Sequence, residues 1–187
     1  SDNSCYHVVD YDTITGQVLK KNTHQGFSHE SAWARGQEWA LYGYTMCYRE
    51  THLPEFLSQA KKVEEYIFTH PNMPEDDIPY WDFNAPDIPH EPRDVSAATI
   101  IASALYELSL YVPERAENYK KRADKILATL SGHYRASLKK DNGFLLLHST
   151  GTKPKNVEVD VSIVYADYYF IEALLRKDKL EKTGNLF

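Results

Sequence analysis

The sequence predicts an all-α fold in which helices form an inner and an outer layer, as in a helical toroid, in preference to a simple helical bundle. About five segments show the helical spacing of apolar residues, and only short stretches alternate with the period of a β-strand. Some of these helices have one mostly polar face, and others are apolar almost all round. This difference is expected when an outer layer of helices encloses an inner one. No exact internal repeat is present, so a solenoid of repeated helix pairs is disfavoured.

The first third of the chain predicts a hairpin followed by two helices. Residues 5–20 alternate apolar and polar side chains around a Thr-Gly turn, which indicates a short β-hairpin. Helical spacing then begins at Ser28 or Ser31, either of which could act as an N-cap, and continues to about Glu50. Pro54 is typical of the first turn of a second helix, whose apolar residues share one face.

A long loop separates these helices from the next one. Residues 71–94 contain eight charged groups and six of the nine prolines, yet they also carry the apolar group Tyr80, Trp81 and Phe83. An ordered loop of this length inside a compact domain is often functional. Asp94 or Ser96 is expected to cap the helix that follows.

The second half of the chain predicts three further helices. Residues 96–112 are small and apolar almost all round, which indicates a helix buried on most sides. Pro113 is expected to start the next helix. A strand over 144–148, a Gly/Lys/Pro loop to about Asn156 and a last helix over 162–176 complete the prediction, with Asp160 as a helix cap.

Composition excludes several classes of function. The 187 residues suit one globular domain, and a net charge of −6 argues against a nucleic-acid partner. No apolar stretch is long enough for a membrane helix, and no signal peptide is visible, so the sequence does not distinguish cytoplasm from periplasm. Cys5 and Cys47 lack metal or redox spacing, and neither zinc motifs nor phosphate-binding loops occur, so neither a metal nor a cofactor is expected.

One helix start concentrates polar and aromatic groups. Arg35 and Trp39 are four residues apart and share a helix face, and His24 and Gln25 lie in the loop just before. A guanidinium binds a carboxylate through two parallel hydrogen bonds, and an indole offers a flat face to a sugar ring. Together these residues predict a site for a planar, anionic ring. Alternatively, Trp39 belongs to the core and an interior acid pairs with the arginine: Glu30, Glu38 or Glu158.

Asp82 is a second candidate for chemistry. It lies between Trp81 and Phe83, and burial among aromatic rings raises the pKa of a carboxyl group and could make it an acid. A salt bridge from Asp82 to Arg93 is the structural alternative. A glycosidase built on Asp82 and another aspartate has little support from the sequence.

Four blocks of sequence resemble glycoside hydrolase family 88, the unsaturated glucuronyl hydrolases. The blocks are SCYHVVDYDTITGQVL, HQGFSHESAWARGQEWALYGYTMCYRE, PYWDFNAP with RDVSAA, and EVDVSIVYADYYFIEALLR. They occur in order along nearly the whole chain. The resemblance implies an (α/α)6 barrel that hydrolyses oligosaccharides left by polysaccharide lyases, whose non-reducing end is a 4,5-unsaturated uronic acid.

The resemblance also implies roles for particular residues. An aspartic acid protonates C4 of the enol ether and water adds at C5, without metal or cofactor, and His7 and Gln25 would orient that water. Arg35 and Trp39 would hold the unsaturated ring, with His24 beside it and Trp81 as a further aromatic wall. The loop 148–155 would face the next sugar, with Ser149 in it and Lys153 or Lys155 near a sulfate or carboxylate. Without the resemblance, His7 is most simply a structural hydrogen-bond donor on a strand.

This chain departs from the family pattern in one important respect. The two catalytic aspartates of the family precede the hairpin with which this chain starts, and five helices are too few for twelve. Residues 1–187 are therefore expected to be the C-terminal half of one barrel domain, inactive alone. Their partners would be the unsaturated uronic-acid oligosaccharide and either an N-terminal half or another copy that covers the open apolar seam. Two other functions remain as alternatives to a glucuronyl hydrolase. One is a non-catalytic carbohydrate-binding or structural helical fragment, and the other is an unsaturated rhamnogalacturonyl hydrolase.

Overall fold

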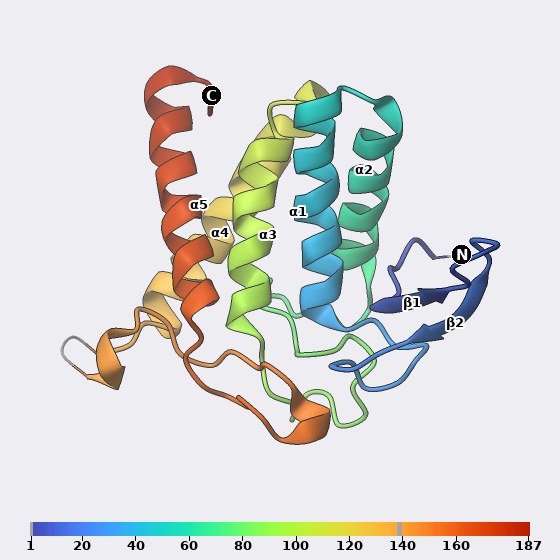
Figure 1. Cartoon of the computed structure of the whole chain (residues 1–187). Helices are drawn as coiled ribbons and strands as arrows, with labels where there is room; N and C mark the ends of the chain where they lie inside the picture. The colour runs from blue at the N-terminus through green and yellow to red at the C-terminus, as the bar shows by residue number, and fades with distance from the viewer. Residues whose placement is uncertain (1, 138–139) are drawn as a thin grey trace.

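The computed structural model describes residues 2–137 and 140–187. Within them the chain forms five α-helices and one two-stranded antiparallel sheet (Figure 1). The elements are β1 (Val8–Tyr11), β2 (Val18–Asn22), α1 (Ala34–Thr51), α2 (Pro54–Thr69), α3 (Val95–Leu108), α4 (Ala116–His133) and α5 (Val164–Thr183). The all-α prediction, the hairpin and the number of helices are confirmed.

The helices form two layers, and α3 lies in the middle of one of them. Helix α3 packs against α1, α4 and α5, and α2 packs against α1. In Figure 1, α5, α3 and α1 stand side by side in front, and α4 and α2 lie behind them. All fourteen residues of α3 are buried, as its small and apolar composition predicts. No helix of the described residues is long and apolar enough to span a lipid bilayer.

Helix α1 begins later than the sequence predicts. Its N-cap is Trp33, which makes no side-chain cap, and the predicted caps Ser28 and Ser31 lie in the preceding turn. The Ser31 hydroxyl donates instead to the Asp82 carboxylate at 2.7 Å. The backbone N–H of Ala34 finds its acceptor in the carbonyl of Trp81, at 3.1 Å. The long loop thus caps α1, and this long-range contact is invisible to local capping rules.

The starts of α3 and α4 follow local chemistry. Of the two predicted caps for α3, Asp94 is the N-cap, and its side chain accepts from the backbone N–H of Ser96. Pro113 begins a 3₁₀ turn, Pro113–Arg115, that leads directly into α4 at Ala116.

The predicted strand over 144–148 is wrong. Leu146 makes only an isolated bridge to Arg135, and the N–H groups of Leu145 and Leu146 donate to the Asp167 carboxylate at 2.8 and 3.0 Å. The N–H of Leu145 is the donor that the next rung of a ladder would need, and a side chain has taken it.

The predicted cap for the last helix is also wrong. Helix α5 begins at Val164, and its N-cap is Ile163. Asp160 has a left-handed backbone (φ 57°) and pairs instead with His148, at 2.7 Å.

Candidate active site

A pocket opens where the hairpin meets the first turns of α1. Its volume is about 340 Å³. Three of its lining residues, His7, Gln25 and Trp39, were predicted as site residues from the sequence. The full lining is Tyr6, His7, Gln25, Trp33, Gly36 and Trp39. The hairpin supplies residues from just before β1 and just after β2, and α1 supplies the rest from one face.

The imidazole of His7 lies against an aromatic wall. Its ring centroid is 4.4 Å from that of Trp33, and the ring of His24 meets it edge-on at 6.2 Å. The backbone N–H of His24 donates to Nδ1 of His7 at 3.3 Å, which places the proton of the neutral ring on Nε2. Burial, together with the charges of His24 and Arg35, lowers the pKa of His7 below its ordinary value of 6.5. The ring is therefore neutral at pH 7 and has an N–H to donate.

Gln25 is held by a distant loop. Its side-chain N–H donates to the carbonyl oxygen of Gly151 at 2.9 Å, which leaves the side-chain carbonyl as an acceptor. Gly151 is tightly enclosed, because a Cβ there would lie 2.6 Å from a carboxylate oxygen of Glu158. Gln25 is thus oriented by the backbone carbonyl of Gly151, a residue whose Cβ would clash with Glu158.

Arg35 is internally paired, which differs from the expectation of a free guanidinium. The residue is 2% exposed, and its Nη1 lies 2.6 Å from the carboxylate of Asp94. The interior acids considered from the sequence, Glu30, Glu38 and Glu158, were the wrong partners. Its remaining contacts are the Ser96 hydroxyl and the carbonyl oxygens of Thr150 and Gly151.

The charge of Arg35 nevertheless lies close beneath the pocket. Its guanidinium carbon is 4.8 Å from the ring centroid of Trp33 and 5.3 Å from that of Tyr165. The Nε–H and one N–H of Nη2 have no acceptor among the described residues. These two donors are what the arginine can still offer a ligand.

Five predicted site residues lie outside the pocket lining: His24 and Arg35, which adjoin it, and Trp81, Ser149 and Lys153, which lie farther away. Trp81 is 3% exposed and donates its indole N–H to Glu91 at 2.8 Å, so it packs behind Trp33 instead of forming a wall. Lys153 pairs with the same Glu91 at 2.8 Å, and Ser149 is fully buried. Lys153 lines a separate, wider groove of about 590 Å³.

Asp82 holds the loop before α1. It is fully buried and accepts from the N–H groups of Phe27 and Asn84 and from the Ser31 hydroxyl, all at 2.7–2.8 Å. The predicted salt bridge to Arg93 is wrong, because Arg93 pairs with Asp76. Burial raises the pKa of Asp82, as predicted, but the carboxyl group does not line the pocket.

Within residues 2–137 and 140–187, no group of three or more potential ligands could hold a metal ion.

Sequence reasoning missed Trp33, which lines the pocket beside Trp39. The indole of Trp33 lies against His7 at a tilt, while the pattern pointed to Trp39 and Trp81. The available signal was Gly36, three residues after Trp33. A Cβ at Gly36 would lie 2.9 Å from the indole, so only glycine lets the ring fold over the start of the helix.

Comparison with known proteins places this arrangement in a family. No family model matches the chain. An unsaturated glucuronyl hydrolase of Formosa agariphila is 53% identical over 182 residues, which cover 96% of this chain and 44% of that protein. An unsaturated chondroitin disaccharide hydrolase of Streptococcus agalactiae is 34% identical over 178 residues, which cover 94% of this chain and 44% of that protein.

Solved structures agree with these sequence matches. A crystal structure of an unsaturated glucuronyl hydrolase specific for heparin superposes with a TM-score of 0.94 at 48% identity, covering 97% of this chain and 49% of that one. The unsaturated glucuronyl hydrolase of Bacillus sp. GL1 gives a TM-score of 0.88 at 29% identity, covering 94% and 47%. The chain spans about half the length of the curated relatives it matches. In sequence and in fold, the chain belongs to the unsaturated glucuronyl hydrolases, glycoside hydrolase family 88.

Proposed function

We propose that residues 1–187 form the C-terminal half of an (α/α)6-barrel catalytic domain that acts on unsaturated uronides. The reaction is removal of the non-reducing terminal 4,5-unsaturated uronic acid from oligosaccharides that a lyase has generated. A proton adds to C4 of the enol ether and water adds at C5, after which the hemiketal opens and releases the neighbouring sugar. The names of the relatives support this class of substrate, since they specify glucuronyl and chondroitin disaccharide hydrolysis.

One observation carries the proposal: His7, Gln25 and Trp39 meet in a single pocket. The neutral imidazole of His7 has an Nε2–H to donate, and Gln25 retains a carbonyl oxygen to accept. A water molecule can accept from the first and donate to the second, which aims its remaining lone pair at a carbon atom above the indole of Trp39. Donor, acceptor and flat apolar wall together can position a water molecule beside a planar ring.

The carboxylate of the sugar would interact with Arg35 through the two N–H groups that lack an internal acceptor. His24, exposed beside His7, contributes to the rim. Ser149, Lys153 and Trp81 do not line the pocket, so their proposed roles are indirect. Ser149 and Lys153 lie in the loop that carries Gly151, and Lys153 also lines the neighbouring groove. In that groove Lys153 is paired with Glu91, so a sulfate on the next sugar would have to compete with this carboxylate.

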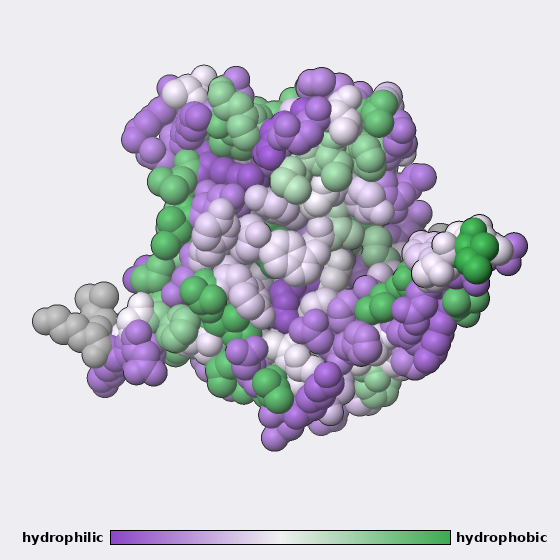
Figure 2. Space-filling model, viewed as in Figure 1, coloured by the Kyte–Doolittle hydropathy of each residue, from purple (hydrophilic) through white to green (hydrophobic). Residues whose placement is uncertain are grey.

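The acid that protonates C4 is proposed to come from the remaining half of the barrel, whose docking surface includes α5. On one side α5 buries Ala166, Phe170 and Ala173. On the opposite side its apolar residues are exposed, and Figure 2 shows hydrophobic atoms along this edge of the molecule. The exposed residues are Val164, Tyr168, Ile171 and Leu175. Because they recur at helical spacing, another helix is expected to pack here, from the other half or from a second copy.

The test is complementation. The chain is expressed alone and together with the part of the Formosa agariphila relative that lies outside the matched segment. Unsaturated disaccharides from chondroitin, heparin and pectin are the substrates, and loss of the ultraviolet absorbance of the C4–C5 double bond is followed. The chain alone should be inactive, and the complemented enzyme should hydrolyse the glycosaminoglycan disaccharides faster than the pectin product.

Variants locate the activity in the pocket. His7→Ala and Trp39→Ala should each lower kcat/KM of the complemented enzyme by at least about 10²-fold, the range of one positioned catalytic group. Lys121→Ala, an exposed change on α4 that lines neither the pocket nor the groove, is the control. Turnover by the isolated chain would refute the half-site reading. Binding of the disaccharide without turnover, even after complementation, would instead support a carbohydrate-binding module.

A further inference from the structure

Three aromatic rings meet directly above the pocket. Trp39 contacts Tyr42 and Tyr169 edge-to-face, with ring centroids 6.4 and 5.2 Å apart. Tyr42 and Tyr169 also contact each other edge-to-face at 5.3 Å. Each ring of this aromatic triangle therefore restricts the other two. Trp39 is the only member that lines the pocket, so the orientation of its indole depends on two tyrosines that do not.

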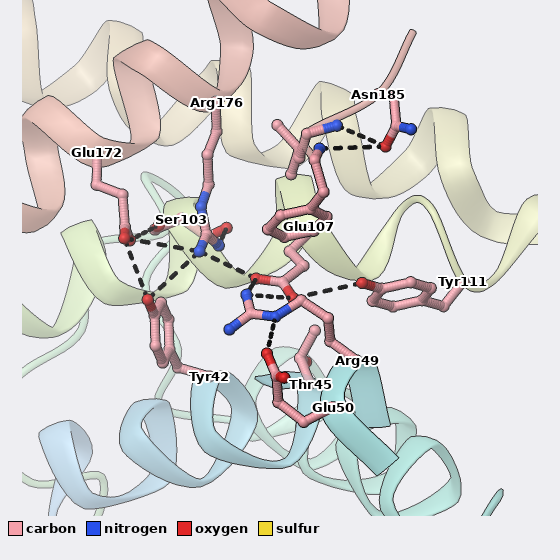
Figure 3. Close-up of polar contacts among 12 residues, drawn as sticks. Tyr42, Thr45, Arg49, Glu50, Ser103, Glu107, Tyr111, Glu172, Arg176 and Asn185 are labelled. Atoms are coloured by element: carbon pink, nitrogen blue, oxygen red, sulfur yellow. Dashed lines mark hydrogen bonds and ion pairs between the residues drawn. The ribbon is translucent and has the colours of Figure 1, made fainter. Parts of the chain in front are cut away.

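A charged cluster fixes one corner of the triangle (Figure 3). The hydroxyl of Tyr42 donates to Glu172 at 3.1 Å and accepts from Nη2 of Arg176 at 3.3 Å. A phenol with both a charged acceptor and a charged donor cannot rotate without losing both bonds. The side chains that hold this hydroxyl come from α5, whereas Tyr42 belongs to α1.

The cluster is itself tied into the interior. Arg176 also pairs with Glu107 of α3 at 3.0 Å, and Glu107 is 1% exposed. Arg49 of α1 pairs with Glu107 from the other side, at 3.0 Å. The carboxylate of Glu107 thus lies between two guanidinium groups. Removing either arginine would take away part of the positive charge that stabilises this carboxylate in the interior, so the cluster is costly to disrupt. The hydroxyl of Tyr42 is thus anchored to a rigid junction of α1, α3 and α5.

We infer that Tyr42 is a positioning residue for Trp39: its hydrogen bonds to Glu172 and Arg176 hold the indole in the orientation that stacks on the sugar. This inference rests on the proposed function, in which Trp39 binds the unsaturated ring. Without the hydroxyl, the ring of Tyr42 keeps its place in the core but is no longer locked. Trp39 then samples other orientations in the free enzyme, and ordering its side chain when substrate binds weakens the binding free energy.

The experiment compares two tyrosine-to-phenylalanine variants. Tyr42→Phe removes the lock. Tyr111→Phe is the matched control, because its hydroxyl reaches the same Glu107 at 3.5 Å while its ring packs on Tyr48, away from the triangle. In the complemented enzyme, Tyr42→Phe should raise KM about 3- to 10-fold with kcat within about twofold, which is the pattern of lost uniform binding. Tyr111→Phe should change neither.

A second readout needs no catalysis. The chain has three tryptophans, so its indole N–H signals are readily resolved by ¹⁵N NMR and assigned by substitution. Tyr42→Phe should shift or broaden the Trp39 signal and leave those of Trp33 and Trp81 unchanged, and Glu172→Ala should reproduce this change. Glu172→Gln retains an acceptor for the hydroxyl and should restore most of the parent spectrum.

The outcomes separate the inference from the proposed function. If Tyr42→Phe lowers thermal stability but leaves both KM and the Trp39 signal as in the parent, the cluster is merely structural and the inference is wrong. A changed signal with unchanged KM also refutes it, because the indole orientation would then not matter to the sugar. If the complemented parent shows no turnover of any uronide, the proposed function fails, and a Trp39 signal that still responds to Tyr42→Phe supports the lock alone.

Discussion

Glu38 should make the protein less stable as the pH rises, and replacing it with glutamine should remove this effect. Its carboxyl group is fully buried on α1, and neither oxygen has a hydrogen-bond partner in the part of the chain that the structure describes. Burial raises its pKa well above the ordinary value of 4.5, and the nearby charge of Asp94 acts in the same direction. The folded protein therefore holds a proton that the unfolded chain releases above pH 4.5.

The size of the effect follows from this difference of one proton. Between pH 4.5 and the pKa of the folded state, the free energy of unfolding falls by about 1.4 kcal/mol per pH unit, because the folded state binds one proton more. Glu38→Gln cannot ionise and lacks this slope. Its stability relative to the parent should therefore rise as the pH increases from 4.5 towards the pKa of the folded state. Below pH 4.5 the two proteins should respond to pH alike.

Urea unfolding followed by circular dichroism at closely spaced pH values measures the difference. Glu55→Gln, an exposed change on α2, is the control and should not show this difference. Parallel curves for Glu38→Gln and the parent between pH 5 and 8 would refute the reasoning. They would mean that Glu38 is ionised in the folded state and that its charge is solvated there.

Three further predictions concern the residues around the pocket. Arg35→Met leaves Asp94 buried without its cation and should cost about 3–5 kcal/mol of unfolding free energy, measured by urea titration. Gly151→Ala places a Cβ 2.8 Å from the Cβ of Glu158, which cannot rotate away, and should lower stability by about 1–3 kcal/mol. By contrast, Gly132→Ala, with open space inside α4, should raise stability by up to about 1 kcal/mol; equal midpoints of thermal unfolding would contradict this. His7 should titrate below 6.5 in an NMR pH series, since burial lowers its pKa; a midpoint above 6.5 would show that its ring is solvated.

Local patterns predicted part of the pocket lining. The four-residue spacing placed Arg35 and Trp39 on one face of a helix start, and the residues just before it brought Gln25 to the same place. His7 joined them through the family resemblance, since a histidine on a strand carries little signal by itself. These predictions needed only short-range geometry or a recognisable block of sequence.

Predictions that depended on distant partners were less successful. Arg35 pairs with Asp94, 59 residues away, although nearer glutamates seemed equally suitable. Trp81 was expected in the site because it is aromatic, yet its indole N–H is satisfied by Glu91 and the ring is buried. Charge and hydrophobicity identify which residues need a partner, but they do not identify the partner.

Helical periodicity, prolines and sequence motifs were enough to predict the helices, the hairpin and the family, because each of these signals spans only a few neighbouring residues. Three features emerge only from the packing of distant segments: Arg35 faces an internal acid, Trp33 shares the pocket with Trp39, and Tyr42 links this pocket to a charged junction of three helices. Such contacts depend on how helices pack against one another, and packing is set by the summed fit of many distant side chains.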